Sequence, residues 1–312
     1  MESRVYYRKL YRHVWSVAHP PGKRVRFGDK IIVMVYLWSV LNDRPVRWAC
    51  ERGNWPAGPA GPDFELPSDS TMSDRLRTLG VQQLLERVMT CASDGFGVPL
   101  VKALDSKPMF VGAYSKDRQA VKGRVAQGQF ARGYRLHTLN HGRAVRHFVV
   151  APMNQHDASV APVLLRRLEG AGYAAADNAF DSNELHQDAA ARGHQLVAPA
   201  RAKNKAVRDA KHNCPQRLRA LDLLDNPLKR AGVKDAAGGE AGRFGRELYD
   251  CRQRVESGYG GLTLLGLHYL PAWVRGPRRV ALWAAGKILI HLYRCAEKLP
   301  REIKSYGVNR KC

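Results

Sequence analysis

The sequence has few acidic residues for its length. Its 312 residues include 28 Asp and Glu against 51 Lys and Arg, which gives a formal net charge of +23 at pH 7. An excess of this size is typical of proteins that bind a polyanion. Nucleic acid is therefore the leading partner, with acidic lipid and ribosomal RNA as the alternatives.

Cysteines are also scarce and widely separated. The six stand at positions 50, 91, 214, 251, 295 and 312, and no two of them form a Cys-x-x-Cys pair. That spacing argues against a zinc ribbon. We interpret the six as the reduced thiols of a cytoplasmic protein.

Long apolar runs are absent. The run at residues 31–41 covers only 11 positions, and the run at residues 280–293 is interrupted by Lys287. A membrane span needs about 20 apolar residues, so both runs are better interpreted as buried helices. The basic N-terminus is not followed by the apolar segment and cleavage site of a signal peptide. We therefore expect no membrane partner.

The chain divides by pattern into three parts. Residues 1–95 predict a helical region, residues 96–300 a catalytic domain, and residues 301–312 a loose basic tail. Within the catalytic domain, residues 201–247 form a basic insertion that ends in a Gly-rich stretch. This insertion is expected either to follow DNA phosphates or to be a solvated basic loop.

The helical region begins with a basic and aromatic segment, residues 1–25, which predicts a loosely held arm. Residues 29–40 predict a buried helix. A capping box at Thr71-x-x-Asp74 predicts the start of another helix that runs on to Met89. We interpret the region either as a module that recognises DNA ends or as a structural cap or dimer surface.

Short strands replace helices after residue 96. Two helices are expected among them, at residues 158–168 and 182–191. The order of elements is β-β-β-α-β-α-β, which is that of the ribonuclease-H-like fold, an α/β fold with a mixed five-stranded sheet flanked by helices. The five strands are expected at residues 98–104, 133–140, 144–151, 173–177 and 195–198.

Two aspartates end apolar runs within this pattern. Asp105 follows the first predicted strand, and Asp177 ends the fourth. The first three strands would pair antiparallel, and the helix before the fourth strand would make it parallel to the first. We therefore expect Asp105 and Asp177 to be neighbours in space, with Asp181 as the alternative to Asp177.

A third acid is expected on a helix over residues 248–265. Tyr249, Arg252 and Glu256 have offsets of 0, 3 and 7, which lie on one face of a continuous helix. A carboxylate beside a cation suits a metal ion and a phosphate, and three such acids suit two-metal phosphoryl transfer. Glu240 and Glu247 are the alternatives to Glu256.

These residues resemble the motifs of bacterial insertion-sequence transposases of the DDE superfamily. The closest branch has the signature Tyr-(2)-Arg-(3)-Glu-(6)-Lys, but Thr263 stands at the last position. The block at residues 175–182 is similar to the second-acid block, with Asn178 and Ala179 as departures. The segment from Asn154 to Asp157 is similar to the central hairpin region, and the resemblance covers about residues 25–300.

The resemblance implies a transposase that cleaves the ends of its element and joins them to target DNA. Asp105, Asp177 and Glu256 would be the catalytic residues and would hold Mg²⁺, as two ions, for which Mn²⁺ can substitute. The partners would be the terminal inverted repeats and target DNA, bound by a homodimer at the bacterial nucleoid. The DNA contacts would come from Tyr249, Arg252, Arg275, Arg278, Arg279 and Lys287.

Two other functions fit the same residues. One is an element-derived DNA-binding protein that no longer cleaves, which the loss of Lys at position 263 favours. The other is a ribonuclease-H-like nuclease without strand transfer. Three acids in register argue against the first, and the N-terminal helical region argues against the second.

Overall fold

A computed structural model describes residues 2–20, 25–56, 62–126, 129–201, 209–224 and 240–297. The chain forms two compact units. The first comprises residues 1–96, 265–267 and 278–312, and the second comprises residues 97–264 and 268–277. The tail at residues 301–312 and much of the basic insertion, including Lys203, Lys205, Arg208, Lys229 and Arg230, lie outside the described residues.

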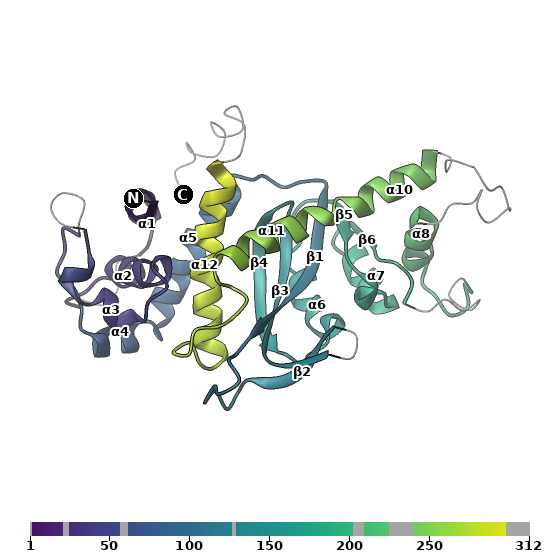
Figure 1. Ribbon diagram of the computed structural model, residues 1–312. Helices are drawn as coiled ribbons and strands as arrows, with labels where there is room; N and C mark the ends of the chain where they lie inside the picture. The colour runs from purple at the N-terminus through teal and green to yellow at the C-terminus, as the bar shows by residue number, and fades with distance from the viewer. Residues whose placement is uncertain are drawn as a thin grey trace. The chain divides into compact units, whose positions relative to one another are not determined.

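The first unit is helical (Figure 1). Its central helix, α2, is buried along most of its length because its residues are apolar on every side. Gly286 lets α12 approach this helix closely, since a Cβ at that position would lie 2.9 Å from a methyl group of Val40. The helices of this unit are α1 (Glu2–Ser16), α2 (Asp29–Leu41), α3 (Val46–Ala49), the 3-10 helix η1 (Arg52–Asn54), α4 (Asp69–Arg75), α5 (Leu79–Asp94) and α12 (Pro277–Glu297).

Two expectations for this unit are wrong. The N-terminal segment is not a loose arm, because α1 buries Leu10 and Val14 completely. The capping box does not start a helix at Thr71: Ser68 is the N-cap, and its hydroxyl accepts a hydrogen bond from the Thr71 N–H. The expected helix is in fact α4 and α5, separated by a short turn.

The second unit is built on one mixed sheet. The strand order is β2-β3-β1-β5-β6, and β4 also pairs with β3. This is the predicted ribonuclease-H-like α/β fold, but the sheet has six strands rather than five. The strands are β1 (Val101–Phe110), β2 (Val121–Ala126), β3 (Gln129–His141), β4 (Ala144–Pro152), β5 (Gly172–Ala175) and β6 (His194–Val197).

The additional strand is β2, which lies in a Gly-, Lys- and Arg-rich stretch with no apolar alternation. It pairs antiparallel with the first residues of β3. Gly123 also allows β2 to lie close to the residue after β4, because a Cβ at position 123 would lie 2.4 Å from the backbone of Met153. Backbone pairing and a close contact therefore create a strand that the side-chain pattern does not indicate.

The predicted pairings of the other strands are confirmed. β1 pairs antiparallel with β3, β3 pairs antiparallel with β4, and β5 pairs parallel with both β1 and β6. However, β1 runs on to Phe110, so Asp105 lies within the strand and not at its end. Ala103 is paired with Ala175, which makes Asp105 and Asp177 each the second residue after a paired position.

Helices cover both faces of this sheet (Figure 1). On one face, α6 (Asp157–Leu165) and α7 (Asn183–Ala190) pack on an apolar core that includes Leu104 and Leu139. On the other face, α11 (Gln253–Leu264) contacts β1 and β4. Gly258 permits this contact, because a Cβ there would lie 2.9 Å from the carbonyl oxygen of Arg143.

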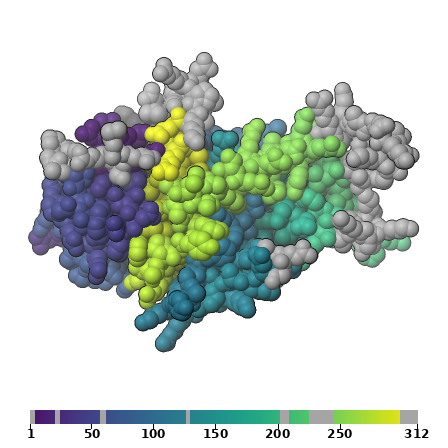
Figure 2. All heavy atoms as spheres, in the orientation of Figure 1, coloured from purple at the N-terminus to yellow at the C-terminus, as the bar shows by residue number. Residues whose placement is uncertain are grey.

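The helix expected over residues 248–265 is in fact two helices. α10 (Glu240–Asp250) packs against α8 (Pro215–Leu224), and α11 follows after a turn. In that turn the Arg252 N–H donates to the Tyr249 carbonyl three residues back, at 2.9 Å, rather than four. The space-filling view shows α10 and α11 as a continuous band on the visible face of the second unit (Figure 2).

Candidate active site

The two aspartates of the sheet are held by backbone N–H groups. Oδ1 of Asp105 accepts from the Ser106 N–H at 2.8 Å. Oδ1 of Asp177 accepts from the Ala179 N–H at 2.9 Å, so Asp177 is the N-cap of the 3-10 helix η3 (Asn178–Phe180). These contacts orient both carboxylates at the place where β1 and β5 lie side by side.

Burial raises the pKa of Asp105 to about 6. The Ser106 N–H and the Arg252 guanidinium oppose this shift, and the carboxylates of Asp177 and Asp157 add to it. Burial also raises the pKa of Asp177, and the charge of Asp157 adds to that shift. Each aspartate therefore lies in a site where its charged form is disfavoured until a cation offsets it.

Arg252 links Asp105 to the third acid. Its Nη1 lies 3.4 Å from Oδ2 of Asp105, and its Nη2 lies 3.4 Å from Oε1 of Glu256. Its guanidinium also lies over the Tyr249 ring, 5.5 Å from the ring centroid. Burial alone would lower the pKa of Arg252, but the charges of Tyr249, Asp105 and Glu256 raise it.

The four residues are thus brought together, although not on a single helix. Tyr249 belongs to α10, Arg252 to the turn, and Glu256 to the first turn of α11. Glu256 has 61% of its side chain exposed, whereas Asp105 has 14%. The prediction that these residues share one face of a single helix is wrong. The residues that it predicts to be neighbours nevertheless lie next to one another.

The oxygen donors of this site have the chemistry that Mg²⁺ prefers. Burial raises the pKa of both Asp105 and Asp177, so a cation bound beside them would favour their charged forms. In the part of the chain that the structure describes, no three His, Cys, Asp or Glu residues lie close enough to hold a metal ion together. Arg252 instead lies between Asp105 and Glu256. The carboxylate oxygens are of the kind that a divalent ion binds, while the carboxylate of Glu256 contacts the guanidinium.

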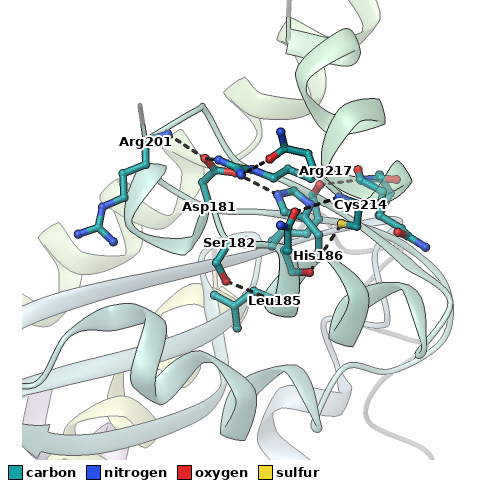
Figure 3. A network of polar contacts seen from close by, with 12 residues as sticks. Asp181, Ser182, Leu185, His186, Arg201, Cys214 and Arg217 are labelled. Atoms are coloured by element: carbon teal, nitrogen blue, oxygen red, sulfur yellow. Dashed lines mark hydrogen bonds and ion pairs between the residues drawn. The ribbon is translucent and has the colours of Figure 1, made fainter. Parts of the chain in front are cut away.

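Asp181, the alternative to Asp177, belongs to a different hydrogen-bond network (Figure 3). Its carboxylate is fully buried and accepts from Nε and Nη2 of Arg217, at 2.8 and 2.6 Å, and from the Arg201 N–H, at 2.8 Å. Burial alone would raise the pKa of Asp181, but hydrogen bonds from His186, Arg217 and Arg201 hold it far below its usual range. Ser182, and not Asp181, caps α7.

Residues 96–293, more than half of the chain, match the family model of the transposase DDE domain. The chain belongs to the DDE transposase family. No curated protein and no solved structure matches it. Membership gives the chain the general role of a transposase, an enzyme of a family that acts on DNA and typically uses divalent metal ions. No helix within the described residues is long and apolar enough to cross a membrane.

The DDE domain has a further acid whose charge acts on its two aspartates, at the end of the segment from Asn154 to Asp157. Asp157 is the first residue of α6, and its Oδ1 lies 3.1 Å from Nδ1 of His137. Its Oδ2 lies 3.5 Å from Nη1 of Arg135. Arg135 and His137 stand two positions apart on β3, so their side chains point to the same face of the sheet. That spacing in the sequence indicates that both can contact one partner.

The basic residues expected to contact DNA are in different situations. Arg275, Arg278 and Arg279 are exposed. Lys287 is 1% exposed, is paired with Asp43, and lies 5.0 Å from the centroid of the Trp283 ring. The packing of α12 thus buries the charge of Lys287 against a carboxylate, whereas the three arginines are at the surface.

Proposed function

We propose that Asp105, Asp177 and Glu256 are the catalytic acids of an insertion-sequence transposase. It would cleave the ends of its element and join them to target DNA. The observation that carries this proposal is the parallel pairing of β1 with β5, which aligns Asp105 with Asp177. The contact of Arg252 with both Asp105 and Glu256 adds the third acid to that pair.

The two aspartates would hold Mg²⁺ or Mn²⁺ together, and Glu256 would complete the set. A divalent ion bound there would make the attacking oxygen a better nucleophile and stabilise the leaving oxygen. The backbone N–H groups of Ser106 and Ala179 keep one oxygen of each aspartate in place. The other oxygen of Asp177 and Oδ2 of Asp105, which contacts Arg252 in the free protein, would bind the ion.

Arg252 has two tasks in this proposal. It offsets the charge of Asp105 and orients Glu256 while no cation is bound. Since a guanidinium also binds phosphate oxygens well, it can contact the DNA backbone once a cation has taken over that charge. Its stacking on Tyr249 keeps the guanidinium plane fixed during this exchange.

The partners of the proposed reaction are the terminal inverted repeats and target DNA. The helices of the first unit would recognise the repeats, and Arg275, Arg278 and Arg279 would contact phosphates. Two ends must be joined together, so the active form would be a homodimer on DNA, located at the bacterial nucleoid. The net charge of +23 supports binding to a long polyanion.

The test is cleavage of a labelled duplex that carries the DNA flanking this gene, with Mg²⁺ or with EDTA. Wild type is compared with Asp177→Asn and Glu256→Gln, and Glu247→Gln on α10 is the matched control. We expect metal-dependent cutting that the first two variants lose and the control keeps, while all four proteins bind the duplex. Binding without cutting by wild type would favour the inactive DNA-binding protein, and strand cutting without joining would favour the nuclease.

A further inference from the structure

Lys107 is a second charged residue on the α11 face of β1. It lies two positions after Asp105, so their side chains share one face, with their Cα atoms about 7 Å apart. Thr138, the residue paired with Asp105, also contacts α11, since its hydroxyl lies 2.6 Å from that of Tyr259. This face of the sheet is therefore polar and covered by α11.

The ammonium of Lys107 lies next to an exposed residue at the end of α11. The residue is only 8% exposed, but its Nζ donates to Oγ1 of Thr263 at 2.6 Å, and Thr263 is exposed. The Thr263 hydroxyl in turn donates to the Tyr259 carbonyl at 2.9 Å. Thr263 thus fixes the position of the ammonium, while the stem of Lys107 is buried.

The charge of Lys107 is not offset within the part of the chain that the structure describes. Its partner there is a hydroxyl, and no carboxylate pairs with it. A buried cation without a counter-charge is unfavourable unless an anion from outside joins it.

A second buried lysine of the same strand shows the contrast. Lys102 faces the opposite side of the sheet, and its Nζ donates to the Ala171 carbonyl at 2.8 Å. The carboxylate of Glu169 acts on this charge and partly compensates its burial. Lys102 therefore has a carboxylate of the fold near it, whereas the partner of Lys107 is a hydroxyl.

We propose that Lys107, positioned by Thr263, binds a phosphate oxygen of the DNA backbone next to the phosphodiester held at Asp105. This inference rests on the proposed function. α11 then meets one DNA strand at two points, with Glu256 at its beginning and the Lys107 ammonium beside its end. Lys107 supplies from β1 a positive charge at the end of α11, where α11 itself has Thr263.

The experiment measures binding to the labelled flanking duplex in EDTA across a series of salt concentrations. For Lys107→Met we expect weaker binding and a slope of log K against log salt that is shallower by about one, the change produced by one lost phosphate contact. Lys107→Arg should keep the wild-type slope. Thr263→Lys should restore the slope in the Lys107→Met background, because it places an ammonium at the same end of α11.

The matched control is Lys102→Met, which removes a buried ammonium from the other face and should leave the slope unchanged. A wild-type slope in Lys107→Met would overturn the proposal, as would binding by wild type that does not depend on salt. If Lys107→Met does not fold, Thr263→Val decides: it removes the hydroxyl that holds the ammonium and should weaken binding, and unchanged binding would overturn the proposal. Because binding is measured without metal, a wild type that binds but never cuts would refute the proposed catalysis and not this inference.

Discussion

The two faces of β1 place adjacent residues in different surroundings. Leu104 faces α6 and α7 and joins a core with Leu139, Leu164 and Leu196. Asp105, the next residue, faces the α10–α11 turn and contacts Arg252 at 3.4 Å. Leu104 is therefore surrounded by apolar side chains of the protein, whereas Asp105 and Lys107 on the other face carry charges that are only partly offset.

Adjacent residues of one strand therefore contribute to different properties, one to stability and the other to function. Apolar burial contributes to folding whether or not a ligand is present. Unbalanced buried charges reduce stability in the free protein and become favourable only when a ligand or ion binds. Substitutions on the two faces should therefore affect different measurements.

The largest expected effect is a difference in cleavage rate between variants of two adjacent residues of β1. Asp105→Asn should lower metal-dependent cleavage by about a thousandfold or more, since residues that act as one catalytic unit lose most of the rate together. Ser106→Ala, on the other face, keeps the backbone N–H that Asp105 accepts from and should change the rate less than about tenfold. Single-turnover cleavage at saturating enzyme measures both, and equal losses would remove the distinction between the faces.

On the apolar face, Leu104→Ala should lower the free energy of unfolding by about 2–5 kcal/mol, because it leaves a cavity in the core. Leu104 is fully buried, and its neighbours are held by backbone pairing on both sides of β1. Chemical denaturation measures the change. Cleavage per folded molecule should remain near wild type, and a catalytic loss without a stability loss would contradict the interpretation.

The pair of Asp177 and Asp181 extends the comparison to the loop after β5. Asp181→Asn should destabilise the protein by about 3 kcal/mol at neutral pH, because it leaves the Arg217 guanidinium without its buried partner. The pKa of Asp181 is lowered in the folded state, so its stabilisation is present above the ordinary value of about 3.9 and decreases as pH falls below it.

Denaturation of wild type and Asp181→Asn at several pH values checks this prediction. The difference between the two should be largest near neutral pH and should shrink in acid. Asp177→Asn is the control, since Asp177 has a raised pKa and no buried ion pair of this kind. A constant difference across the pH range would show that Asp181 does not act through its charge.

The smallest effect is a gain in stability from the loss of a catalytic acid. Burial raises the pKa of Asp105 to about 6 in the folded protein, against about 3.9 in the unfolded chain. Above pH 6 the folded state contains a disfavoured carboxylate, so Asp105→Asn should stabilise the metal-free protein by about 1–2 kcal/mol. Below pH 4 the carboxyl is protonated in both states and the gain should vanish.

Thermal unfolding in EDTA at pH 8 and at pH 4 measures this gain. The variant should melt at a higher temperature than wild type at pH 8 and at the same temperature at pH 4. A lower melting temperature at pH 8 would mean that the contact between Asp105 and Arg252 outweighs the effect of burial.

Local pattern was sufficient for the order of the strands and for the parallel crossover that joins Asp105 to Asp177. Apolar runs, a helix between two strands and the handedness of connections all depend on neighbours in the sequence. The spacing of Tyr249, Arg252 and Glu256 likewise identified residues that do meet. It did so because residues three and four apart remain close whether they lie on one helix or across a tight turn.

Other features depend on contacts between distant parts of the chain. β2 exists because the backbone of β3 offers it a partner. The hydrogen bond of Lys107 to Thr263 joins residues 156 positions apart, and that of Asp181 to Arg217 joins residues 36 apart. Neither composition nor periodicity indicates such pairs, since packing alone determines which buried charges are offset within the fold and which are left for a ligand.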